Sequence, residues 1–558
     1  MKKFVGVDFG TSTTLVARMR SGVPEVVNLA DPSQREDASI PWLPSVVETA
    51  GSGDPVVRQA GQRAIDRVIR SAKQAITRNE DFVQEGDSVS ANAAIRAILS
   101  EVRLRATAAE DKPLERATVR LGCPAMWDAT QRKRLLDIAL AAGLKANRAE
   151  MIDEPIAAGA SWIADEVAQG REVNGRVLVV DYGGGTLDVA VLDVASTPKG
   201  IETINVMSAD SFSEAGDAID ELIANDVLKR GGFTGALAGR TPSGGVASGA
   251  LRRGARELKE ALTTKAKATV DVDTAKSGVE KISYDREAMD AAVAPLLERG
   301  VAFAFAILRA AILMDEKQPT ISEIRALTPE MLASGTSKTG VPRHGYTPRP
   351  VDYVLLSGGT SYMPAVEDHY RESFPSATIV RHPRPQEAVA LGLALDSVYD
   401  SMNLFRPGFD IVRIDADGAE ETLYEANDPL YARDQVWRGE FALGLRLPLA
   451  CRTRDKVEEV TIQFRDSAGK PQDLVSRTAG EAPTDGIKVT IGPAEGGFIK
   501  LSVHGQLKIV TGDRRTMVLG VVAWPAPFGD VHGFTVEELP SWYRSSRPGT
   551  GGTPGEPG

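Results

Sequence analysis

The chain has 558 residues, of which 42% are hydrophobic and 25% charged, a composition typical of a globular protein with room for several domains. Its formal net charge of −11 argues against general binding to nucleic acid or anionic membranes. Two widely separated cysteines, Cys123 and Cys451, exclude a disulfide framework and a cysteine-based metal site, and the five histidines lack zinc-type spacing.

The chain starts with MKKFVGVDFG, in which two lysines precede a short apolar run. Asp8 interrupts that run almost at once, unlike the core of a signal peptide. No run of roughly 18 apolar residues, the length needed to span a bilayer, stands out in the sequence. We therefore expect a cytoplasmic protein that does not engage a membrane.

The first 400 residues alternate between strand-like and helical patterns, which predicts an α/β architecture. Short apolar runs ending at Gly or Pro predict buried strands. These runs are FVGVDFG, ATVRLGCP, RVLVVDYGGG and VDYVLLSGG. Apolar residues recur at helical spacing in 251–264, and the polar, Gly/Pro-containing stretch 315–349 predicts a surface insertion.

Beyond about residue 403 the pattern changes to alternating apolar and polar residues. Segments 460–464, 487–491 and 498–503 alternate in this way, with turn signals between them. We expect a mostly antiparallel β domain over 410–540 with one solvated face. The preceding α/β part is expected to cover 1–402, and 546–558 reads as a disordered Gly/Pro tail.

One pattern occurs twice, in VGVDFGTSTTLVA near the N-terminus and in LVVDYGGGTLDVA over 178–190. Each copy has an apolar strand, then Asp, an aromatic residue and Gly, then small or hydroxyl residues and a second strand. Glycines in such a turn let backbone N–H groups point at phosphate oxygens. A single copy fits an ordinary hairpin equally well. Two copies about 170 residues apart favour two related halves that hold one nucleotide.

Asp8 and Asp181 stand just before the two turns. A carboxylate beside a polyphosphate would repel it, so we expect both to act through Mg²⁺ and its waters. Hydroxyl groups in and after the turns can donate hydrogen bonds to phosphate oxygens, namely those of Thr11, Ser12, Thr13 and Thr186.

With these loops in place, the order of motifs over residues 1–400 resembles the seventy-kilodalton heat-shock (DnaK-type) chaperone family of the actin-like ATPase superfamily. The resemblance implies a two-lobed actin-like ATPase fold, with duplicated ribonuclease-H-like halves. The motifs that carry the resemblance are, in chain order, Asp8 to Thr11, Pro44 to Val46, Lys73, Pro124 and Arg132, Asp153 to Ala158, Asp181 to Asp188, Gly216 to Asp220, Leu356 to Pro364 and Pro385 to Ala390.

The resemblance implies roles for individual residues, with ATP or ADP, Mg²⁺ and, as a further candidate ion, K⁺ as ligands. Catalysis would fall to Lys73, Asp181, Thr186, Glu154 and Asp8. Mg²⁺ would be held mostly through water by Asp8, Asp181 and Asp188, while Pro124 and Arg132 would relay the nucleotide state. Nucleotide contacts would come from Gly10, Thr11, Ser12, Thr13, Gly183, Gly184, Gly185, Gly216, Asp217, Lys259, Thr263, Gly358, Gly359, Thr360 and Tyr362. For Lys73 alone, a solvated helix lysine is the ordinary alternative.

The chain departs from the family's pattern around the adenosine. Arg256 stands where the family has a glutamate, and Glu260 where it has an arginine. Tyr362 replaces an arginine, and Gln386 an aspartate. Tyr362 could stack on the base or simply pack in a rearranged wall.

The C-terminal part also departs, because neither the family's acidic linker nor its helical lid is evident. The leading hypothesis is a nucleotide-switched, chaperone-like ATPase whose β domain binds polypeptide, served by a J-domain co-chaperone and a nucleotide-exchange factor. A second hypothesis is an ATP-dependent scaffold or sensor that recruits one specific protein. A small-molecule kinase or filament-forming actin relative is disfavoured by the close match of the second loop.

Overall fold

The structure is a computed structural model. It describes residues 4–30, 37, 39–48, 56–57, 68–78, 80–84, 87–108, 114, 117–127, 129–231, 242–274, 278–312, 326–336, 347–403, 410–424, 436–439, 442–452, 457–465, 469–471, 486–492, 497–502, 506–510 and 516–521. The expected 546–558 tail and the predicted boundary at 404–409 lie outside these residues. The predicted domain limits therefore stay predictions.

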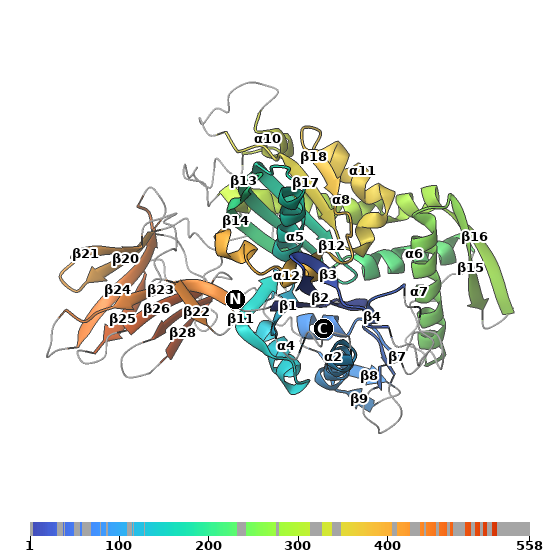
Figure 1. Ribbon diagram of the computed structural model, residues 1–558, viewed down its shortest axis with the longest axis horizontal. Helices are drawn as coiled ribbons and strands as arrows, with labels where there is room; N and C mark the ends of the chain where they lie inside the picture. Colours follow the sequence, from blue (N-terminus) through green and yellow to red (C-terminus); the bar gives the residue numbers. More distant parts are fainter. Residues whose placement is uncertain are drawn as a thin grey trace, which may run out of the picture.

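Two large sheets with the same topology organise the α/β part (Figure 1). In each sheet an antiparallel three-stranded meander is extended by two parallel strands, on the side of the first strand. The first sheet contains β1 (Phe4–Phe9), β2 (Thr13–Arg20), β3 (Val23–Val26), β10 (Thr118–Cys123) and β11 (Ala146–Asp153), with β4 (Leu43–Pro44) beside β2. The second contains β12 (Gly175–Tyr182), β13 (Leu187–Thr197), β14 (Gly200–Phe212), β17 (Tyr353–Ser357) and β18 (Thr378–Arg381), with β19 (Met402–Asn403) beside β14. The repeated topology agrees with the two related halves predicted from the sequence.

Two helices fill the space between the sheets. Helix α5 (Glu154–Ala168) packs on β12 and β13, while α12 (Ala388–Ala394) packs on β1 and β2. The two helices cross closely, because a Cβ added at Gly392 would lie 1.8 Å from the carbonyl oxygen of Ala157. Only glycine fits at such a crossing. The lobes therefore meet through a layer of small, fully buried side chains.

Smaller elements extend each lobe away from the shared layer. Around the first sheet these are β5 (Val47–Glu48), β6 (Val56–Val57), β7 (Val68–Ile69), α1 (Ala72–Arg78), β8 (Phe82–Gln84), β9 (Asp87–Val89), α2 (Ala91–Ala108) and α4 (Ala129–Ala141). Around the second they are α6 (Gly216–Arg230), α7 (Pro242–Leu262), β15 (Lys267–Thr274), β16 (Gly278–Asp285), α8 (Arg286–Ile312), α10 (Pro329–Ser334), η3 (Gly359–Tyr362), α11 (Pro364–Ser373) and η4 (Val398–Ser401).

The polar stretch expected as a surface insertion is partly built into the second lobe. Within it, α10 begins after Thr328, whose hydroxyl accepts a hydrogen bond from the Met331 amide. Met331 and Leu332 are buried and belong to the core that also includes α8 and α11. A capped helix with one apolar turn was hidden by its polar neighbours, so the surface prediction is wrong for this segment.

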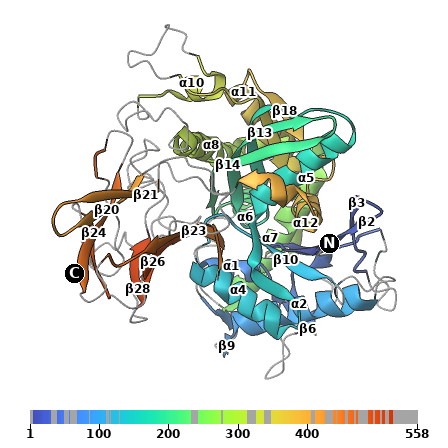
Figure 2. The same cartoon turned by 60° about the vertical axis from the view of Figure 1, so that its left-hand side comes forward.

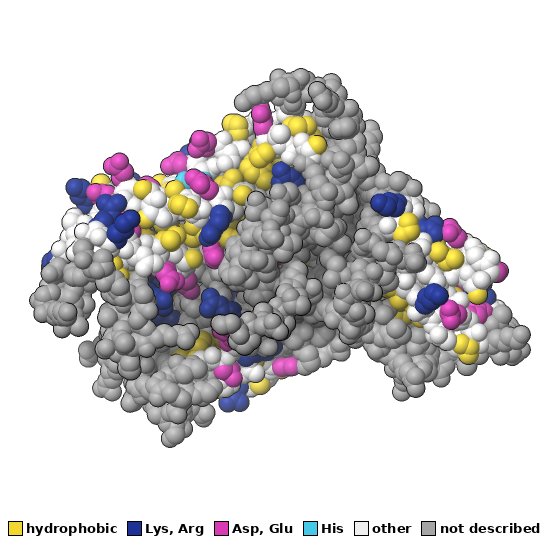
Figure 3. All heavy atoms as spheres, turned by 180° about the vertical axis from the view of Figure 1, so that it is seen from behind, with side chains coloured by type: hydrophobic (Ala, Val, Ile, Leu, Met, Phe, Trp, Pro, Cys, Tyr) yellow, Lys and Arg dark blue, Asp and Glu magenta, His cyan; other side chains and the backbone are white. Residues whose placement is uncertain are grey.

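Helix α8 is long and apolar enough, by length and composition alone, to cross a membrane. Its side chains, however, contribute Met289, Val293 and Leu296 to the core of the second lobe, and Phe305 stacks on Phe374 with ring centroids 4.8 Å apart. A core helix passes the same test. On the face shown in Figure 3, Lys and Arg side chains are interspersed with Asp and Glu.

The described strands after residue 409 form two further antiparallel sheets at one side of the molecule (Figures 1 and 2). One sheet has the order β21 (Glu420–Tyr424), β20 (Asp410–Asp415), β24 (Glu458–Arg465), β25 (Ile487–Ile491). The other has the order β22 (Val436–Gly439), β23 (Ala442–Leu449), β26 (Gly497–Ser502), β27 (Gln506–Val510), β28 (Thr516–Val521). Strands β22 and β23 lie against β11 of the first lobe.

Alternation decides which side chains face inward in this region. Val460, Ile462 and Phe464 on β24 are buried, as the pattern predicted, and share a core with residues of β25 and β26. Buried Arg413 pairs with Asp415 at 2.7 Å and with Glu458 at 2.9 Å, joining β20 to β24. Whether these strands form an independent domain remains a prediction.

Candidate functional site

The first predicted phosphate loop is the turn between β1 and β2. It is closed by a hydrogen bond from the Gly10 amide to the Thr13 carbonyl oxygen, 3.0 Å long. Ser45 supports the loop, because its hydroxyl donates to the Gly10 carbonyl oxygen at 2.8 Å and its amide donates to the Ser12 carbonyl oxygen at 2.9 Å. Thr14 and Ser45 hydroxyls also share a hydrogen bond of 2.9 Å. Ser45 thus fixes the loop through these hydrogen bonds, and the tip of the loop is left for other contacts.

The second loop, between β12 and β13, is built in the same way, with the Gly183 amide 3.0 Å from the Thr186 carbonyl oxygen. Its tip meets the tip of the first loop. A Cβ added at Gly184 would lie 2.5 Å from the Ser12 hydroxyl oxygen, and one at Gly185 would lie 2.5 Å from the Thr11 hydroxyl oxygen. The two loops therefore face one another across the lobes, and their glycines leave backbone where side chains would collide.

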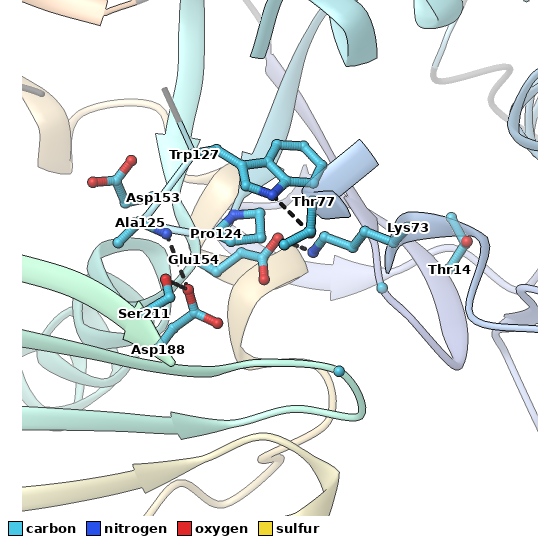
Figure 4. Close-up of polar contacts among 12 residues, drawn as sticks. Thr14, Lys73, Thr77, Pro124, Ala125, Trp127, Asp153, Glu154, Asp188 and Ser211 are labelled. Atoms are coloured by element: carbon cyan, nitrogen blue, oxygen red, sulfur yellow. Dashed lines mark hydrogen bonds and ion pairs between the residues drawn. The ribbon is translucent and has the colours of Figure 1, made fainter. Parts of the chain in front are cut away.

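Carboxylates gather beneath the two loops. Asp8 and Asp181 occupy equivalent places near the ends of β1 and β12, and both are buried. Glu154 lies in the first turn of α5, where the helix dipole favours a negative charge. Its partner is Lys73 on α1, with which it forms a close, fully buried ion pair. Figure 4 shows the two side chains pointing toward each other.

The fourth carboxylate, Asp188, is fixed by the strands around it. It stands opposite Ser211 in the β13–β14 register, and the Ser211 hydroxyl donates to it. The Ala125 amide donates to the same oxygen at 3.0 Å, and the two donors converge on Asp188 in Figure 4. Thr186 supplies a further hydrogen bond. Asp188 therefore links the second loop to the segment that follows β10.

The protonation of this cluster follows from its burial and crowding. Burial and the charges of Asp188 and Asp8 raise the pKa of Asp181 to about 8. Burial also raises the pKa of Asp8 to about 6. Burial opposes the charge on Lys73, but Glu154 and Asp8 outweigh it and raise the lysine pKa above its usual value. One ammonium group thus faces several carboxylates.

These residues fit a Mg²⁺ ion held mainly through water. If all of these carboxylates were ionised, their negative charge would exceed what Lys73 can offset, and Asp181 Oδ1 is buried with no hydrogen-bond partner among the described residues. A hydrated cation would supply both the missing charge and the missing donors. Among the described residues, no three Asp, Glu, His or Cys side chains are arranged to ligate a metal directly.

The two residues predicted to relay the nucleotide state are in contact. Arg132 on α4 donates to the Pro124 carbonyl oxygen at 3.4 Å and pairs with Asp153 at 2.6 Å. Pro124 precedes Ala125, whose amide binds Asp188. Asp153 ends β11 and directly precedes Glu154. A continuous set of polar contacts therefore joins the carboxylate cluster to the end of β11.

Residues predicted to surround the adenosine converge from three elements. The Thr360 hydroxyl donates to the Gly183 carbonyl oxygen at 2.9 Å, and a Cβ added at Gly216 would lie 2.8 Å from the same hydroxyl. Lys259 on α7 donates to the Gly216 carbonyl oxygen at 3.1 Å. Thr263, just beyond α7, instead donates to its own helix at Glu260.

The β17–η3 turn completes this wall. Gly358 adopts φ +78°, and a Cβ there would lie 2.3 Å from the Tyr182 carbonyl oxygen. Gly359 packs near Gln386, and η3 ends at Tyr362, whose side chain is 42% exposed. That exposure leaves the Tyr362 ring accessible to a base, which favours stacking over packing in the wall.

Arg256, the main departure from the family's pattern, is engaged by two carboxylates. It donates to Asp217 at 2.7 Å and to Asp220 at 2.9 Å, joining α7 to α6. The second oxygen of Asp217 accepts a hydrogen bond of 2.6 Å from Ser71 of the first lobe. Asp217 is therefore shared between the two lobes.

Sequence reasoning missed two residues whose side chains reach directly across the lobes. Ser71 contacts Asp217, and Gln74 donates from Nε2 to the Gly185 carbonyl oxygen at 2.7 Å. Both flank Lys73, which was the only signal available. Ser211 was also missed, and the strand register opposite Asp188 could have indicated it only once the pairing was known.

Two lobes of repeated topology, with glycine loops that meet above carboxylates, are consistent with an actin-like ATPase fold. Residues 54–324 match the family model described as Hsp70 protein. The chain is 27% identical over 423 residues to a "Chaperone protein HscA homolog" of Burkholderia ambifaria (strain MC40-6), and 28% identical over 423 residues to the protein of the same name in Burkholderia cenocepacia (strain HI2424). The chain is thus similar to the Hsp70 family, at modest identity over most of its length.

In each comparison the match covers 70% of this chain and 58% of the relative. The resemblance to the Hsp70 family predicted from the sequence motifs is thereby confirmed. The roles of individual site residues are not tested by these comparisons and stay predictions.

Proposed function

We propose that this protein binds ATP with Mg²⁺ and hydrolyses it slowly, as the motor of a chaperone-like cycle. The observation that carries the proposal is the meeting of Gly184 and Gly185 with Ser12 and Thr11 above the buried carboxylates. Similarity to the Hsp70 family supports the same conclusion. ATP and Mg²⁺ are therefore the ligands that we propose for this site.

Each residue has a defined task in this proposal. Backbone amides of the two loops bind the phosphates, and the hydroxyl of Thr186 holds the terminal one. Bound Mg²⁺ would neutralise phosphate charge. Lys73 remains protonated beside its carboxylates and stabilises the charge that develops during transfer. Glu154 keeps Lys73 in position through their ion pair.

Substituting Asp181→Asn tests the proposal. The change removes charge that organises Mg²⁺ and its waters, so hydrolysis is expected to fall roughly 10²-fold. The fold should persist, because burial already disfavours the charged form of Asp181. Asp417→Asn, in an exposed turn after β20, is the matched control.

Purified variants are compared by single-turnover hydrolysis of MgATP and by circular dichroism. Equal turnover in the folded Asp181→Asn protein and in the wild type would contradict the assignment of Asp181. A wild-type protein that binds no nucleotide at all would contradict the proposed function itself.

We further propose that the strands after residue 409 bind extended polypeptide and respond to the nucleotide state. Strand β25 is an edge of its sheet, where a peptide could add by main-chain hydrogen bonds. The relay through Pro124, Arg132 and Asp153 leads to β11, on which β22 and β23 lie. A J-domain co-chaperone, an exchange factor and a cytoplasmic location complete the proposal.

One observation favours a second candidate, an ATP-dependent scaffold or sensor. In the described residues after 403 the chain contains strands but no helix that could cover a bound peptide. Binding of varied unfolded peptides to the full chain, in ATP and in ADP, separates the two. Nucleotide-dependent peptide binding supports the chaperone-like function, and its absence in both states supports the scaffold.

A further inference from the structure

Gln74 is half-buried at the meeting point of the two phosphate loops and has no role in the mechanism above. It follows Lys73 on α1 and reaches the second loop, where Nε2 donates to the Gly185 carbonyl oxygen at 2.7 Å. A Cβ added at Gly185 would lie 2.2 Å from that nitrogen and 2.5 Å from the Thr11 hydroxyl oxygen. The Gln74 amide, Thr11 and Gly185 thus meet at one place.

The two ends of the Gln74 amide are in different situations. Because a carbonyl oxygen only accepts, the atom facing Gly185 must be the NH₂ group, which settles the orientation of the amide. The other atom, Oε1, is buried and has no hydrogen-bond donor among the described residues. A buried acceptor left without a donor is unfavourable.

The missing partner of Oε1 must be a hydrogen-bond donor. Ionised phosphate oxygens only accept, so the nucleotide's phosphates cannot fill this role. The neighbouring ammonium of Lys73 is paired with Glu154. A water molecule remains, and a water is also the nucleophile that hydrolysis requires.

We propose that Gln74 holds the attacking water through Oε1, while Nε2 anchors the amide to the second loop. This inference rests on the proposed ATPase function and adds a residue to it. Since the anchor is the carbonyl of Gly185, which precedes Thr186, the water is fixed relative to the loop that binds the terminal phosphate. The water donates a hydrogen bond to Oε1, and its oxygen lone pair attacks phosphorus as the bond to ADP breaks. The proton lost by the water passes to the inorganic phosphate formed.

Two substitutions separate water holding from lobe anchoring. Gln74→Met keeps the volume but neither donates nor accepts, whereas Gln74→Glu keeps an acceptor and loses the donor to Gly185. Gln169→Met, at the exposed end of α5, is the matched control. Each variant is assayed for single-turnover hydrolysis of MgATP, for MgATP affinity and for the dissociation rate of fluorescent ADP.

We expect Gln74→Met to hydrolyse ATP roughly 10²-fold more slowly while its MgATP affinity changes by less than about 3-fold. Gln74→Glu should retain more hydrolysis than Gln74→Met and release ADP faster than the wild type. Hydrolysis by Gln74→Met at the wild-type rate, or a loss explained entirely by weaker binding, would overturn the inference. If Asp181→Asn is inactive in that case, the proposed function survives and only the role of Gln74 is lost.

Discussion

The hydrogen bond between Ser71 and Asp217 predicts how strongly the lobes hold each other. The Ser71 hydroxyl lies 2.6 Å from a carboxylate oxygen whose partner oxygen is fixed by Arg256. A hydrogen bond to a charged group contributes about 1.5–3 kcal/mol. Both side chains are partly exposed, so the lower value applies, which corresponds to about a 12-fold change in an equilibrium constant. Removing the hydroxyl should therefore release bound nucleotide about 10-fold faster.

The backbone at Ser71 provides an internal control. Its φ of +55° lies in the left-handed region, which costs a residue with a Cβ more than it costs glycine. Ser71→Ala keeps that strain and Ser71→Gly relieves it, yet both remove the hydroxyl. We expect both variants to release fluorescent ADP faster in stopped-flow displacement, while Ser334→Ala on α10 behaves as wild type.

Wild-type release rates in both Ser71 variants would refute the reasoning. Faster release in Ser71→Ala alone would mean that the relief of backbone strain in Ser71→Gly offsets the loss of the contact with Asp217.

Three further outcomes are expected. Burial lowers the pKa of His382 to about 4, so below about pH 6.5 the unfolded chain binds a proton that the folded chain does not, and stability falls. In urea unfolding at pH 5.5 the wild type should lose about 1.4 kcal/mol relative to His382→Asn. Equal losses in both proteins would contradict this. Burial raises the pKa of Cys123 to about 12, so iodoacetamide at pH 8 should modify it only after unfolding, and rapid labelling of the native thiol would show that the site opens. Gly184→Ala places a carbon 2.5 Å from the Ser12 hydroxyl oxygen of the first loop, and such overpacking costs about 1–3 kcal/mol. MgATP binding should therefore weaken about tenfold, whereas Gly492→Ala, which adds its carbon in open space, should bind MgATP as the wild type does.

Local patterns were enough to predict the strands and turns that form the phosphate loops. The glycines before Thr186 and the aspartates at the strand ends are contiguous in sequence, so periodicity and turn chemistry located them. The inward positions of Val460 and Ile462 followed from alternation alone. The family resemblance then supplied the order of the motifs.

Contacts between distant residues could not be predicted in the same way. Ser71 and Asp217 are 146 positions apart, and Gln74 and Gly185 are 111 apart, so no local pattern links them. The order of the C-terminal strands was equally hidden, since β23 pairs with β26 rather than with the next strand along the chain. These features depend on how the lobes and sheets pack, which a single sequence does not display.

The position of β11 has a consequence for aggregation. It is the last strand of its sheet, with β10 on one side, and β22 and β23 lie against it. An uncovered sheet edge is a template for pairing with another chain. The C-terminal strands thus cover the edge at β11. A chain shortened to its α/β part would expose this edge and should be more prone to aggregate.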